Sequence, residues 1–431
     1  MDASASSPIA VGSSLQADLQ AIVTPAHVRA AVANDTIAGA KPKWIVEPGN
    51  EEELAKVLRL ANGAGLCVIP RGGGTKLDWG NSPTRSDLVL STSRLDKIIE
   101  HAWADMTVTV EAGCTIEKLQ SSLAQHGQRL ALDVLWPQRA TVGGILSAND
   151  TGALRLRFGS LRDLIIGVTL ALPDGTLARS GGKVVKNVAG YDLQKLATGA
   201  LGTLGVITRA IFRLHPIPHH SRTLKIAAQN AAEAQRAVHA IQDSKLAHSA
   251  LQMCLSSSAS PRIDILLEGT ESGVKAQQEQ LRTLVAPLSA EPRATDSWSA
   301  RQALYSAFEQ NPDRVAVAKI SFLSSAIAAT AESIARLADA HNLAWGIVLQ
   351  AIGTGCVRLE GTASALQTAL QTLRKQLEQN GGSLVVHRRP AELASFDAWG
   401  TAGDAFSLMK AIKMLFDPHA TLNPGRFVGG I

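Results

Sequence analysis

Three consecutive glycines, Gly72–Gly74, are the residues of this chain whose spacing most clearly suggests chemistry. They follow a short apolar run, Leu66–Ile69, which is typical of a strand. Because glycine has no Cβ, successive backbone N–H groups can turn toward one point and cradle a diphosphate. A Rossmann loop would continue into a helix, whereas Leu77–Pro83 has no helical period and contains the helix breakers Gly80 and Pro83. The pattern predicts a flavin or nucleotide site outside the Rossmann class, with a plain tight turn as the alternative.

Three later segments combine small residues with hydroxyl or amide side chains. They are Pro137–Gly152, Gly181–Leu196 with its continuation Gly202–Thr208, and Leu422–Arg426. Small residues let the backbone approach a planar ligand that carries phosphates, and the polar side chains can hydrogen-bond to it. Each segment alone could be a bulge or a turn. Together with the glycine run, in this order and spacing, they predict a flavin site.

Composition and charge argue against several classes of protein. A chain of 431 residues is long for one hydrophobic core, so at least two domains are expected. The 42 Lys and Arg residues are scattered, which argues against a nucleic-acid partner and favours an anionic substrate or cofactor. The four cysteines are far apart, so a zinc site or a cysteine-ligated iron–sulfur cluster on this chain is poorly supported. No apolar run has membrane-spanning length and no signal peptide is apparent, so a cytoplasmic protein is expected.

The first half of the chain alternates short strands and helices. Asn50 is a suitable N-cap, with Glu53 at the capping-box position, for a helix that ends at Gly63 or Gly65. The other predicted elements are a helix at Ile116–Gln125 and strands at Leu66–Ile69, Val108–Glu111, Thr169–Leu172 and Val206–Leu214.

From about residue 220 the pattern changes to longer strand and helix blocks. Strands are predicted at Thr223–Ala227, Ala250–Cys254, Ile263–Glu268, Val315–Phe322, Trp345–Ile352 and Val357–Glu360. Helices are predicted at Ala231–Gln242, Gly273–Val285, Ala326–His341 and Ala363–Glu378. The recurring β-α-β order with antiparallel pairs is typical of a ferredoxin-like α+β domain. A last amphipathic helix is predicted at Asp404–Leu415.

Together the motifs resemble the FAD-binding domain of the vanillyl-alcohol oxidase and para-cresol methylhydroxylase (PCMH) superfamily, among the FAD-linked oxidases that act on 2-hydroxy acids. The runs Lys186–Leu193 and Leu201–Thr208 look most similar to the FAD-binding (E) subunits of bacterial glycolate oxidases. The resemblance covers residues from about 40 to 215 and the C-terminal segment well, and the middle of the chain loosely.

The resemblance implies an α+β fold. A PCMH-type FAD-binding domain of two α/β subdomains would be followed by a ferredoxin-like cap domain and by a C-terminal segment that returns to the flavin. The expected divisions are an N-terminal arm at 1–35, the FAD-binding domain at 36–217, the cap for substrate or partner at 218–390, and the C-terminal segment at 391–431.

Position by position, the resemblance also implies the residues that bind FAD. The pyrophosphate loop falls on Arg71, Gly72, Gly73, Gly74 and Thr75. The second flavin-contacting stretch falls on Pro137, Thr141, Gly143, Gly144, Ser147, Asn149 and Gly152. The adenine–ribose side falls on Gly205, Val206 and Ile207, and the C-terminal contact on Asn423. Some relatives bind the flavin covalently through a histidine of the glycine loop. No His or Cys lies between Arg71 and Lys76, so non-covalent FAD is implied.

The chain departs from its larger relatives at their metal site. Those relatives carry His-x-Gly-Asp-Gly-Asn-x-His, and the matching stretch here is Ala351–Arg358, with Ala351, Thr354 and Arg358 where they have His, Asp and His. Alanine offers no lone pair and arginine is a fixed cation, so no metal site is predicted. His341 and His387 are not spaced to replace the lost ligands, and a solvated or hydrogen-bonded surface position is expected for them. No catalytic base is assigned.

Several interpretations of the cap stay open. It could bind a partner chain, or Arg358 or Lys319 could pair with a substrate carboxylate, or both cations could be solvated strand residues. Tyr191 could contact the flavin or pack under the loop.

The resemblance implies the FAD-binding subunit of a glycolate oxidase (dehydrogenase) complex, which converts glycolate to glyoxylate. The implied partners are a larger FAD-binding catalytic subunit and an iron–sulfur subunit that passes electrons to the membrane quinone pool. The chain itself would be cytoplasmic, or peripheral at the inner face of the membrane through its partners. The alternatives are a stand-alone FAD-dependent 2-hydroxy acid dehydrogenase and a non-catalytic assembly subunit.

Overall fold

The computed structural model describes residues 11–183, 190–293 and 298–431. The first part of the chain forms two sheets. A four-stranded sheet has the order β1-β2-β4-β3, with β2, β4 and β3 parallel. Its elements are α1 (Val11–Val23), β1 (Val28–Ala30), β2 (Trp44–Val46), α2 (Glu51–Gly63), β3 (Val68–Arg71) and β4 (Leu88–Ser91). The predicted strand before the glycine loop is therefore present but begins at Val68, because Leu66 and Cys67 belong to the irregular connection between α2 and the strand.

Helix α2 begins as its sequence predicts. The Asn50 Oδ1 atom accepts a hydrogen bond from the Glu53 amide at 2.8 Å. The Glu53 carboxylate in turn accepts from the Gly49 amide at 2.7 Å. These bonds satisfy N–H groups that have no partner within the helix. The apolar face of the helix, with Leu54 and Leu58 fully buried, packs on the four-stranded sheet.

The second sheet is five-stranded and antiparallel, in the order β5-β6-β10-β8-β9. Its strands are β5 (Ile98–Ala102), β6 (Thr107–Glu111), β8 (Ile165–Ala171), β9 (Leu177–Gly181) and β10 (Val206–Arg213). The helices of this region are α3 (Ile116–Ala124), α4 (Val142–Ala148), α5 (Arg155–Phe158), α6 (Leu161–Leu164) and α7 (Leu193–Ala197). Strands β6, β8 and β10 share one apolar core with α3 and α4. The predicted strands and the predicted helix of this region are confirmed.

The cap is one eight-stranded antiparallel sheet, hereafter the cap sheet, in the order β15-β12-β14-β13-β17-β18-β16-β19. It consists of two ferredoxin-like units joined where β13 pairs with β17. The first unit is β12 (His220–Ala227), α8 (Ala231–Asp243), β13 (His248–Ser256), β14 (Ala259–Gly269), α9 (Glu271–Val285) and β15 (Ala290–Arg293). The second is β16 (Val315–Ser321), α11 (Ile327–Ala340), β17 (Ala344–Gln350), β18 (Thr354–Glu360), α12 (Ala363–Gln379) and β19 (Ser383–Arg388). The predicted ferredoxin-like fold is confirmed, in two copies.

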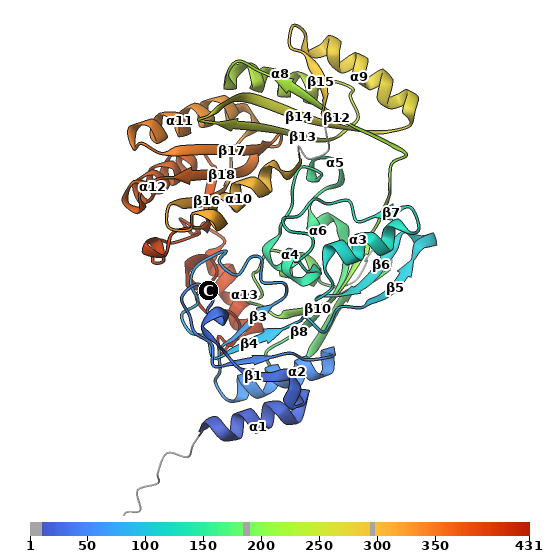
Figure 1. The fold of residues 1–431 in the computed structure, drawn as a ribbon. Helices are drawn as coiled ribbons and strands as arrows, with labels where there is room; N and C mark the ends of the chain where they lie inside the picture. The colour runs from blue at the N-terminus through green and yellow to red at the C-terminus, as the bar shows by residue number, and fades with distance from the viewer. Residues whose placement is uncertain (1–10, 184–189, 294–297) are drawn as a thin grey trace, which may run out of the picture.

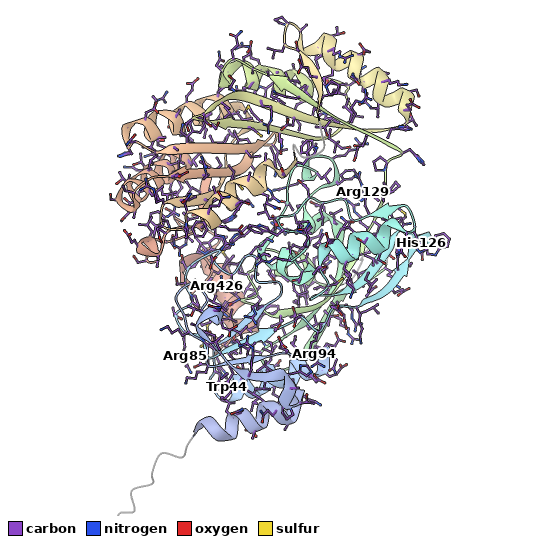
Figure 2. The ribbon with its side chains drawn as sticks, viewed as in Figure 1. Trp44, Arg85, Arg94, His126, Arg129 and Arg426 are labelled. Atoms are coloured by element: carbon purple, nitrogen blue, oxygen red, sulfur yellow. The ribbon has the colours of Figure 1, made fainter. Side chains whose placement is uncertain are left out.

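The two faces of the cap sheet have different roles. The four long helices cover one face and bury its apolar side chains (Figure 1). Because side chains alternate along a strand, the intervening residues point to the opposite face, toward the first two sheets. Helix α10 (Ala300–Gln310) lies against that face, with contacts to β16, β17 and β18. On this same face, Arg129 of β7 (Gln128–Arg129), labelled in Figure 2, forms a bidentate ion pair with Glu268 of β14, at 2.8 and 2.7 Å.

The C-terminal segment returns to the first sheet, as the resemblance implied. Val68 donates a backbone hydrogen bond to Thr421, and Asn423 donates one back to Val68, at 2.7 and 3.0 Å. Helix α13 (Phe406–Phe416) confirms the last predicted helix with a small shift in its bounds. Contrary to the usual amphipathic arrangement, its buried residue is polar and its exposed side is apolar. Lys413 is buried, whereas Leu408 and Leu415 are 62% and 79% exposed. Among the residues that the structure describes, no helix is long and apolar enough to cross a membrane.

Candidate active site

The glycine loop, the start of α4, the start of β10 and the C-terminal segment surround one cleft, hereafter the glycine-loop cleft, with about 690 Å³ of empty space. Most residues predicted for FAD line it. These are Arg71, Gly72, Gly73, Gly74, Thr75, Thr141, Gly143, Gly144, Ser147, Gly205, Val206, Ile207 and Asn423. Three predicted residues, Pro137, Asn149 and Gly152, do not line this cleft. Asn149 instead lines two neighbouring cavities.

The loop glycines permit a very close approach of two backbone segments. A Cβ on Gly73 would lie 1.6 Å from the Arg139 carbonyl oxygen, and one on Gly72 would lie 2.1 Å from the Thr141 Oγ1 atom. Gly74 has a φ of +72°, in the left-handed region that favours glycine. Among the described residues, none of the N–H groups from Gly72 to Thr75 donates to a protein acceptor. The loop therefore presents unpaired amides to the cleft, as a diphosphate requires.

The second predicted stretch forms the start of helix α4. Thr141 is the N-cap, and its Oγ1 accepts from the Gly144 amide at 3.3 Å. A Cβ on Gly143 would lie 2.9 Å from the Ala112 Cβ, so this glycine lets α4 pack directly on the segment after β6. Gly143 and Gly144 thus begin a helix and do not form a bulge.

The C-terminal contact is fixed by hydrogen bonds and leaves one acceptor unused. The Asn423 Nδ2 group donates to the Leu201 carbonyl at 2.5 Å, while its buried Oδ1 atom has no partner among the described residues. Arg426 donates to the carbonyls of Leu77 and Trp79, the latter at 2.8 Å, and so holds the end of the glycine loop. Burial lowers the pKa of Arg426 to about 10, which keeps it charged at neutral pH.

Sequence reasoning missed part of this lining. The unpredicted residues are Pro70, Lys76, Leu77, Thr92, Ala148, Leu201, Gly202 and Arg426. Several of them had a signal in the sequence, because Ala148, Leu201, Gly202 and Arg426 lie in the segments singled out above, and Lys76 follows the glycine loop closely. Thr92 lies just after β4, the parallel neighbour of β3, and only the strand order reveals its position.

Comparisons with known proteins agree with this geometry. Residues 42–181 match the family model described as FAD binding domain, and residues 400–427 match that of FAD linked oxidases, C-terminal domain. The chain carries the two domains of FAD-linked oxidases that these models describe. Its cofactor is FAD. The unpaired loop amides, the free Asn423 Oδ1 atom and the close-packed glycines all fit that dinucleotide.

Relatives of this FAD-linked oxidase include the "Glycolate oxidase subunit GlcD" of Bacillus subtilis (strain 168), which is 26% identical over an alignment of 416 residues that covers 89% of this chain and 88% of that protein. A D-lactate dehydrogenase of Archaeoglobus fulgidus is 37% identical over 173 residues, 40% of this chain and 38% of that protein. Among solved structures, p-cresol methylhydroxylase with substrate bound covers 96% of both chains with a TM-score of 0.79 at 15% identity. That likeness confirms the PCMH-type fold.

A second cavity, hereafter the cap cavity, lies between the inner face of the cap sheet and the segment that follows α4. It has about 560 Å³ of empty space. A third cavity, hereafter the connecting cavity, shares Ala148 and Leu201 with the glycine-loop cleft. It shares Trp79, Asn149, Arg155, Lys319, Thr354 and His387 with the cap cavity. A ligand in the glycine-loop cleft can therefore extend toward the cap cavity.

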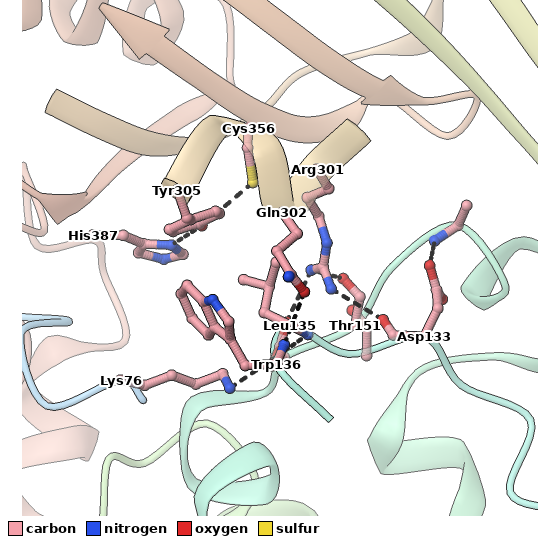
Figure 3. Close-up of polar contacts among 12 residues, drawn as sticks. Lys76, Asp133, Leu135, Trp136, Thr151, Arg301, Gln302, Tyr305, Cys356 and His387 are labelled. Atoms are coloured by element: carbon pink, nitrogen blue, oxygen red, sulfur yellow. Dashed lines mark hydrogen bonds and ion pairs between the residues drawn. The ribbon is translucent and has the colours of Figure 1, made fainter. Parts of the chain in front are cut away.

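A buried charge network ties the cofactor loop to the cap (Figure 3). Lys76 pairs with Asp150 at 3.1 Å, and Asp150 pairs with Arg301 of α10 at 2.8 Å. Arg301 also donates to the carbonyls of Thr151 and Asp133, at 2.7 and 3.0 Å. Although burial opposes ionisation, Lys76 and Arg301 lower the pKa of Asp150 to about 2. The carboxylate of Asp150 is therefore charged and fully paired.

His387 is a central residue of the cap cavity, and the expectation of a surface position is wrong. Its side chain is buried, with the residue only 6% exposed. The Trp79 ring stacks on the His387 ring with centroids 3.7 Å apart. The His387 Nδ1 atom lies 2.7 Å from the Tyr305 hydroxyl (Figure 3). That hydroxyl lies 3.5 Å from the Cys356 Sγ atom. Burial holds the pKa of His387 well below its usual range and the pKa of Tyr305 well above, so both side chains are neutral.

Two cations face these cavities without a counterion. The side chains of Lys319 and Arg155 line both the cap cavity and the connecting cavity. Among the described residues, neither has an ion pair or a side-chain hydrogen bond. Burial lowers the pKa of Lys319, so an anion beside it would be stabilising.

The other side chains considered for the site lie elsewhere. Arg358 pairs with Glu360 at 3.5 Å and does not line these cavities. Tyr191 is 88% exposed, so the packing considered for it is wrong. The quoted residues 186–189 lie outside the described part of the chain. Within the described ranges, no three His, Cys, Asp or Glu side chains are grouped as metal ligands.

Proposed function

We propose that this FAD-linked oxidase is the FAD-binding subunit of a glycolate oxidase (dehydrogenase) complex, and that it oxidises glycolate or a similar 2-hydroxy acid to the 2-oxo acid. The observation that carries the substrate class is the pair of uncompensated cations, Lys319 and Arg155, in cavities that adjoin the glycine-loop cleft. An ammonium and a guanidinium suit the carboxylate that every 2-hydroxy acid carries. Relatives named glycolate oxidase subunit, D-lactate dehydrogenase and D-2-hydroxyglutarate dehydrogenase support the same class.

The residues that would hold FAD follow from the cleft. The amides of Gly72–Thr75 would bind the diphosphate, the start of α4 with Ser147 would follow the flavin, and Gly205–Ile207 would line the adenine–ribose side. Asn423 would accept a hydrogen bond from the flavin edge through its free Oδ1 atom. The described lining of the cleft includes no His or Cys, so we propose non-covalent binding. When bound, FAD supplies the two-electron oxidant for the reaction.

Flavin reduction tests the substrate class directly. The chain purified with FAD is titrated without oxygen with glycolate, D-lactate and D-2-hydroxyglutarate, and the loss of flavin absorbance is recorded. Lys319→Met and Arg155→Met are expected to weaken binding of the acid by roughly 10- to 100-fold, because charge-assisted hydrogen bonds to a carboxylate are lost. The matched control is Arg358→Met, which removes a cation from the neighbouring strand outside the cavities. Equal losses in all three variants would contradict a specific carboxylate site.

We also propose that the chain works in an assembly with a larger FAD-binding catalytic subunit and an iron–sulfur subunit. Helix α13 supports this, because Lys413 is its one buried residue while Leu408, Met414 and Leu415 are 62%, 60% and 79% exposed. An exposed apolar helix face of this kind is typical of a protein–protein contact. We infer that a chain of the same complex covers it. A cytoplasmic location, or a peripheral one through these partners, belongs to the same proposal.

Co-purification tests the assembly. Leu408→Glu with Leu415→Glu is expected to release the partner chains without changing the flavin content, because neither residue lines the glycine-loop cleft. If the wild-type chain instead forms a dimer that these changes disrupt, a second copy covers α13 and the assembly proposal is wrong. Turnover of glycolate by the isolated chain with an artificial acceptor would favour the stand-alone dehydrogenase. A purified chain that binds no flavin would favour the non-catalytic assembly subunit.

A further inference from the structure

We propose that His387 is the catalytic base that takes the hydroxyl proton of the 2-hydroxy acid. This inference rests on the proposed function and deepens it, because oxidation of an alcohol requires a proton acceptor as well as a hydride acceptor. The candidates are the acceptors that line the cap cavity: Asp133, Asp150, Tyr305, Cys356 and His387.

Four of these candidates are occupied or protonated. The Asp133 carboxylate accepts from the amides of Ala153 and Leu154 at 2.7 and 3.0 Å. Asp150 is held by two cations. Burial raises the pKa values of Tyr305 and Cys356, so that both remain protonated. The Nε2 atom of His387 is different, because it makes no hydrogen bond to any described residue while its ring lines the cavity.

The surroundings of His387 orient its ring for this role. The Trp79 ring stacks on it at an interplanar angle of 12°, which fixes the ring plane. Tyr305 lies between His387 Nδ1 and Cys356 Sγ, at 2.7 and 3.5 Å. If Nδ1–H donates to the Tyr305 oxygen and the Tyr305 hydroxyl donates to the Cys356 sulfur, the lone pair of the imidazole is on Nε2. Tyr305 and Cys356 are then positioning residues that set the tautomer.

The base and the proposed carboxylate ligand are neighbours on adjacent strands. Lys319 of β16 is paired with Val385 of β19, and His387 lies two residues further along β19. The pairing is irregular at His387, because Ala318 faces Val386 and Val317 faces Arg388. Lys319 and His387 nevertheless line the same two cavities, so an acid whose carboxylate binds Lys319 can bring its adjacent hydroxyl toward His387.

Bound FAD would supply the two-electron oxidant for this step. The O–H proton would move to His387 Nε2, the Cα–H bond would break with its electron pair leaving as hydride to that oxidant, and the C–O bond would become a carbonyl. The acid is oxidised by two electrons, and the imidazole becomes an imidazolium near the substrate carboxylate.

Chemical rescue distinguishes a base from a structural residue. The His387→Ala and His387→Gln variants are prepared with FAD, alone and with the partner chains, and mixed anaerobically with the 2-hydroxy acid that reduces the wild type. Both are expected to reduce the flavin at least about 100-fold more slowly than wild type. Added imidazole is expected to restore the rate of His387→Ala by about tenfold or more, with saturation, and to leave His387→Gln unchanged. His387→Gln can keep the hydrogen bond to Tyr305 and so guards against a loss of folding.

A binding measurement supplies a readout other than turnover. Acetate carries the carboxylate but no hydroxyl, and its binding is followed by the perturbation of the flavin spectrum. Its Kd is expected to stay within about threefold of wild type in both His387 variants and to rise in Lys319→Met. Tyr305→Phe, which keeps the histidine, is expected to slow flavin reduction by about tenfold and to gain nothing from imidazole.

Three results would overturn the inference. They are flavin reduction by both His387 variants within a few-fold of wild type, the absence of rescue of a His387→Ala protein that still binds FAD and acetate, and equal rescue of both variants. If the wild type with bound FAD and its partners is not reduced by any 2-hydroxy acid, the proposed function itself fails. That outcome is separate, because it appears before any variant is made.

Discussion

The glycine-loop cleft and the cap cavity adjoin each other but are built in opposite ways. The cleft presents backbone to its ligand, and its glycines lie so close to neighbouring segments that a Cβ on Gly73 would meet the Arg139 carbonyl at 1.6 Å. The cap cavity presents side chains, such as Lys319 from β16, His387 from β19 and Arg301 from α10. A site built from backbone should tolerate the loss of side chains and not their gain. A site built from side chains should tolerate added side chains better than the loss of those it has.

The largest effect expected from this difference is that of Gly73→Ala. The new Cβ would meet a backbone oxygen, which cannot rotate away as a side chain can. We expect FAD binding to weaken by at least about 100-fold, and the unfolding free energy to fall by about 1–3 kcal/mol or more, as in overpacked cores. Flavin content after purification and thermal unfolding of the apoprotein measure the two effects.

The matched control is Gly63→Ala, at the end of α2. An added Cβ there would have nothing within 4 Å. This variant should bind FAD as the wild type does and be slightly more stable, by about 0.5–1 kcal/mol, because Ala restricts the unfolded chain. Normal FAD content in Gly73→Ala would show that the two segments can separate, and the contrast between the two sites would not hold.

The next largest effect should come from the network that joins the two sites. Lys76→Met leaves the buried Asp150 with only Arg301 as a cation. Removing one partner of a buried pair typically costs about 3–5 kcal/mol, and urea denaturation should show a loss of this size. Lys118→Met is the control, because its pair with Asp96 is half exposed on both sides and is worth about 1 kcal/mol or less. Similar losses in both variants would argue against a special role for the Lys76 network.

The contrast between the two sites also explains which of their residues could be predicted from the sequence. The glycine loop was singled out from its own residues, whereas the Thr141–Gly144 stretch and Asn423 were implied by the family resemblance; in each case the motif encodes a local backbone conformation. Proline, glycine and N-cap residues report it locally. The close approach of Gly73 to Arg139 accounts for those glycines, although the sequence alone does not reveal which segment they approach.

The cap cavity was not predictable in the same way. His387 was expected at the surface, since nothing near it in the sequence indicates that Trp79 and Tyr305, 308 and 82 residues away in the chain, enclose its ring. Because side chains alternate along a strand, Lys319 and the buried Ala318 are expected on opposite faces of the sheet. The alternation does not reveal which residues lie against the lysine. Helix α10 was missed although Leu304, Tyr305 and Phe308 repeat at helical spacing, because these large apolar residues span little more than one turn.

A pH titration sharpens the account of the buried network. Despite the opposing effect of burial, Lys76 and Arg301 lower the folded-state pKa of Asp150 to about 2 from its ordinary 3.8. A lowered carboxylate pKa contributes stability above the unfolded-state value, and this stability is lost as the pH falls from about 4 toward about 2. The contribution is about 2 kcal/mol. The difference in unfolding free energy between wild type and Asp150→Asn should therefore shrink by about this amount over that range. A constant difference would contradict the assignment.

The smallest expected effect is the loss of a side chain from the glycine-loop cleft. At Ser147, both the loss and the gain of side-chain atoms can be tested at one position. Ser147 lines the glycine-loop cleft from α4, and its backbone carbonyl accepts from the Leu201 amide at 2.9 Å. Ser147→Ala removes at most one hydrogen bond to the ligand, so FAD should bind only about 2- to 10-fold more weakly. Ser147→Leu keeps the backbone contact but adds bulk to the cleft, and it should lose far more affinity. Titration of both apoproteins with FAD, followed by flavin fluorescence, measures the two constants. If Ser147→Ala is as damaging as Ser147→Leu, the serine hydroxyl is a principal ligand, and backbone amides alone do not account for cofactor binding.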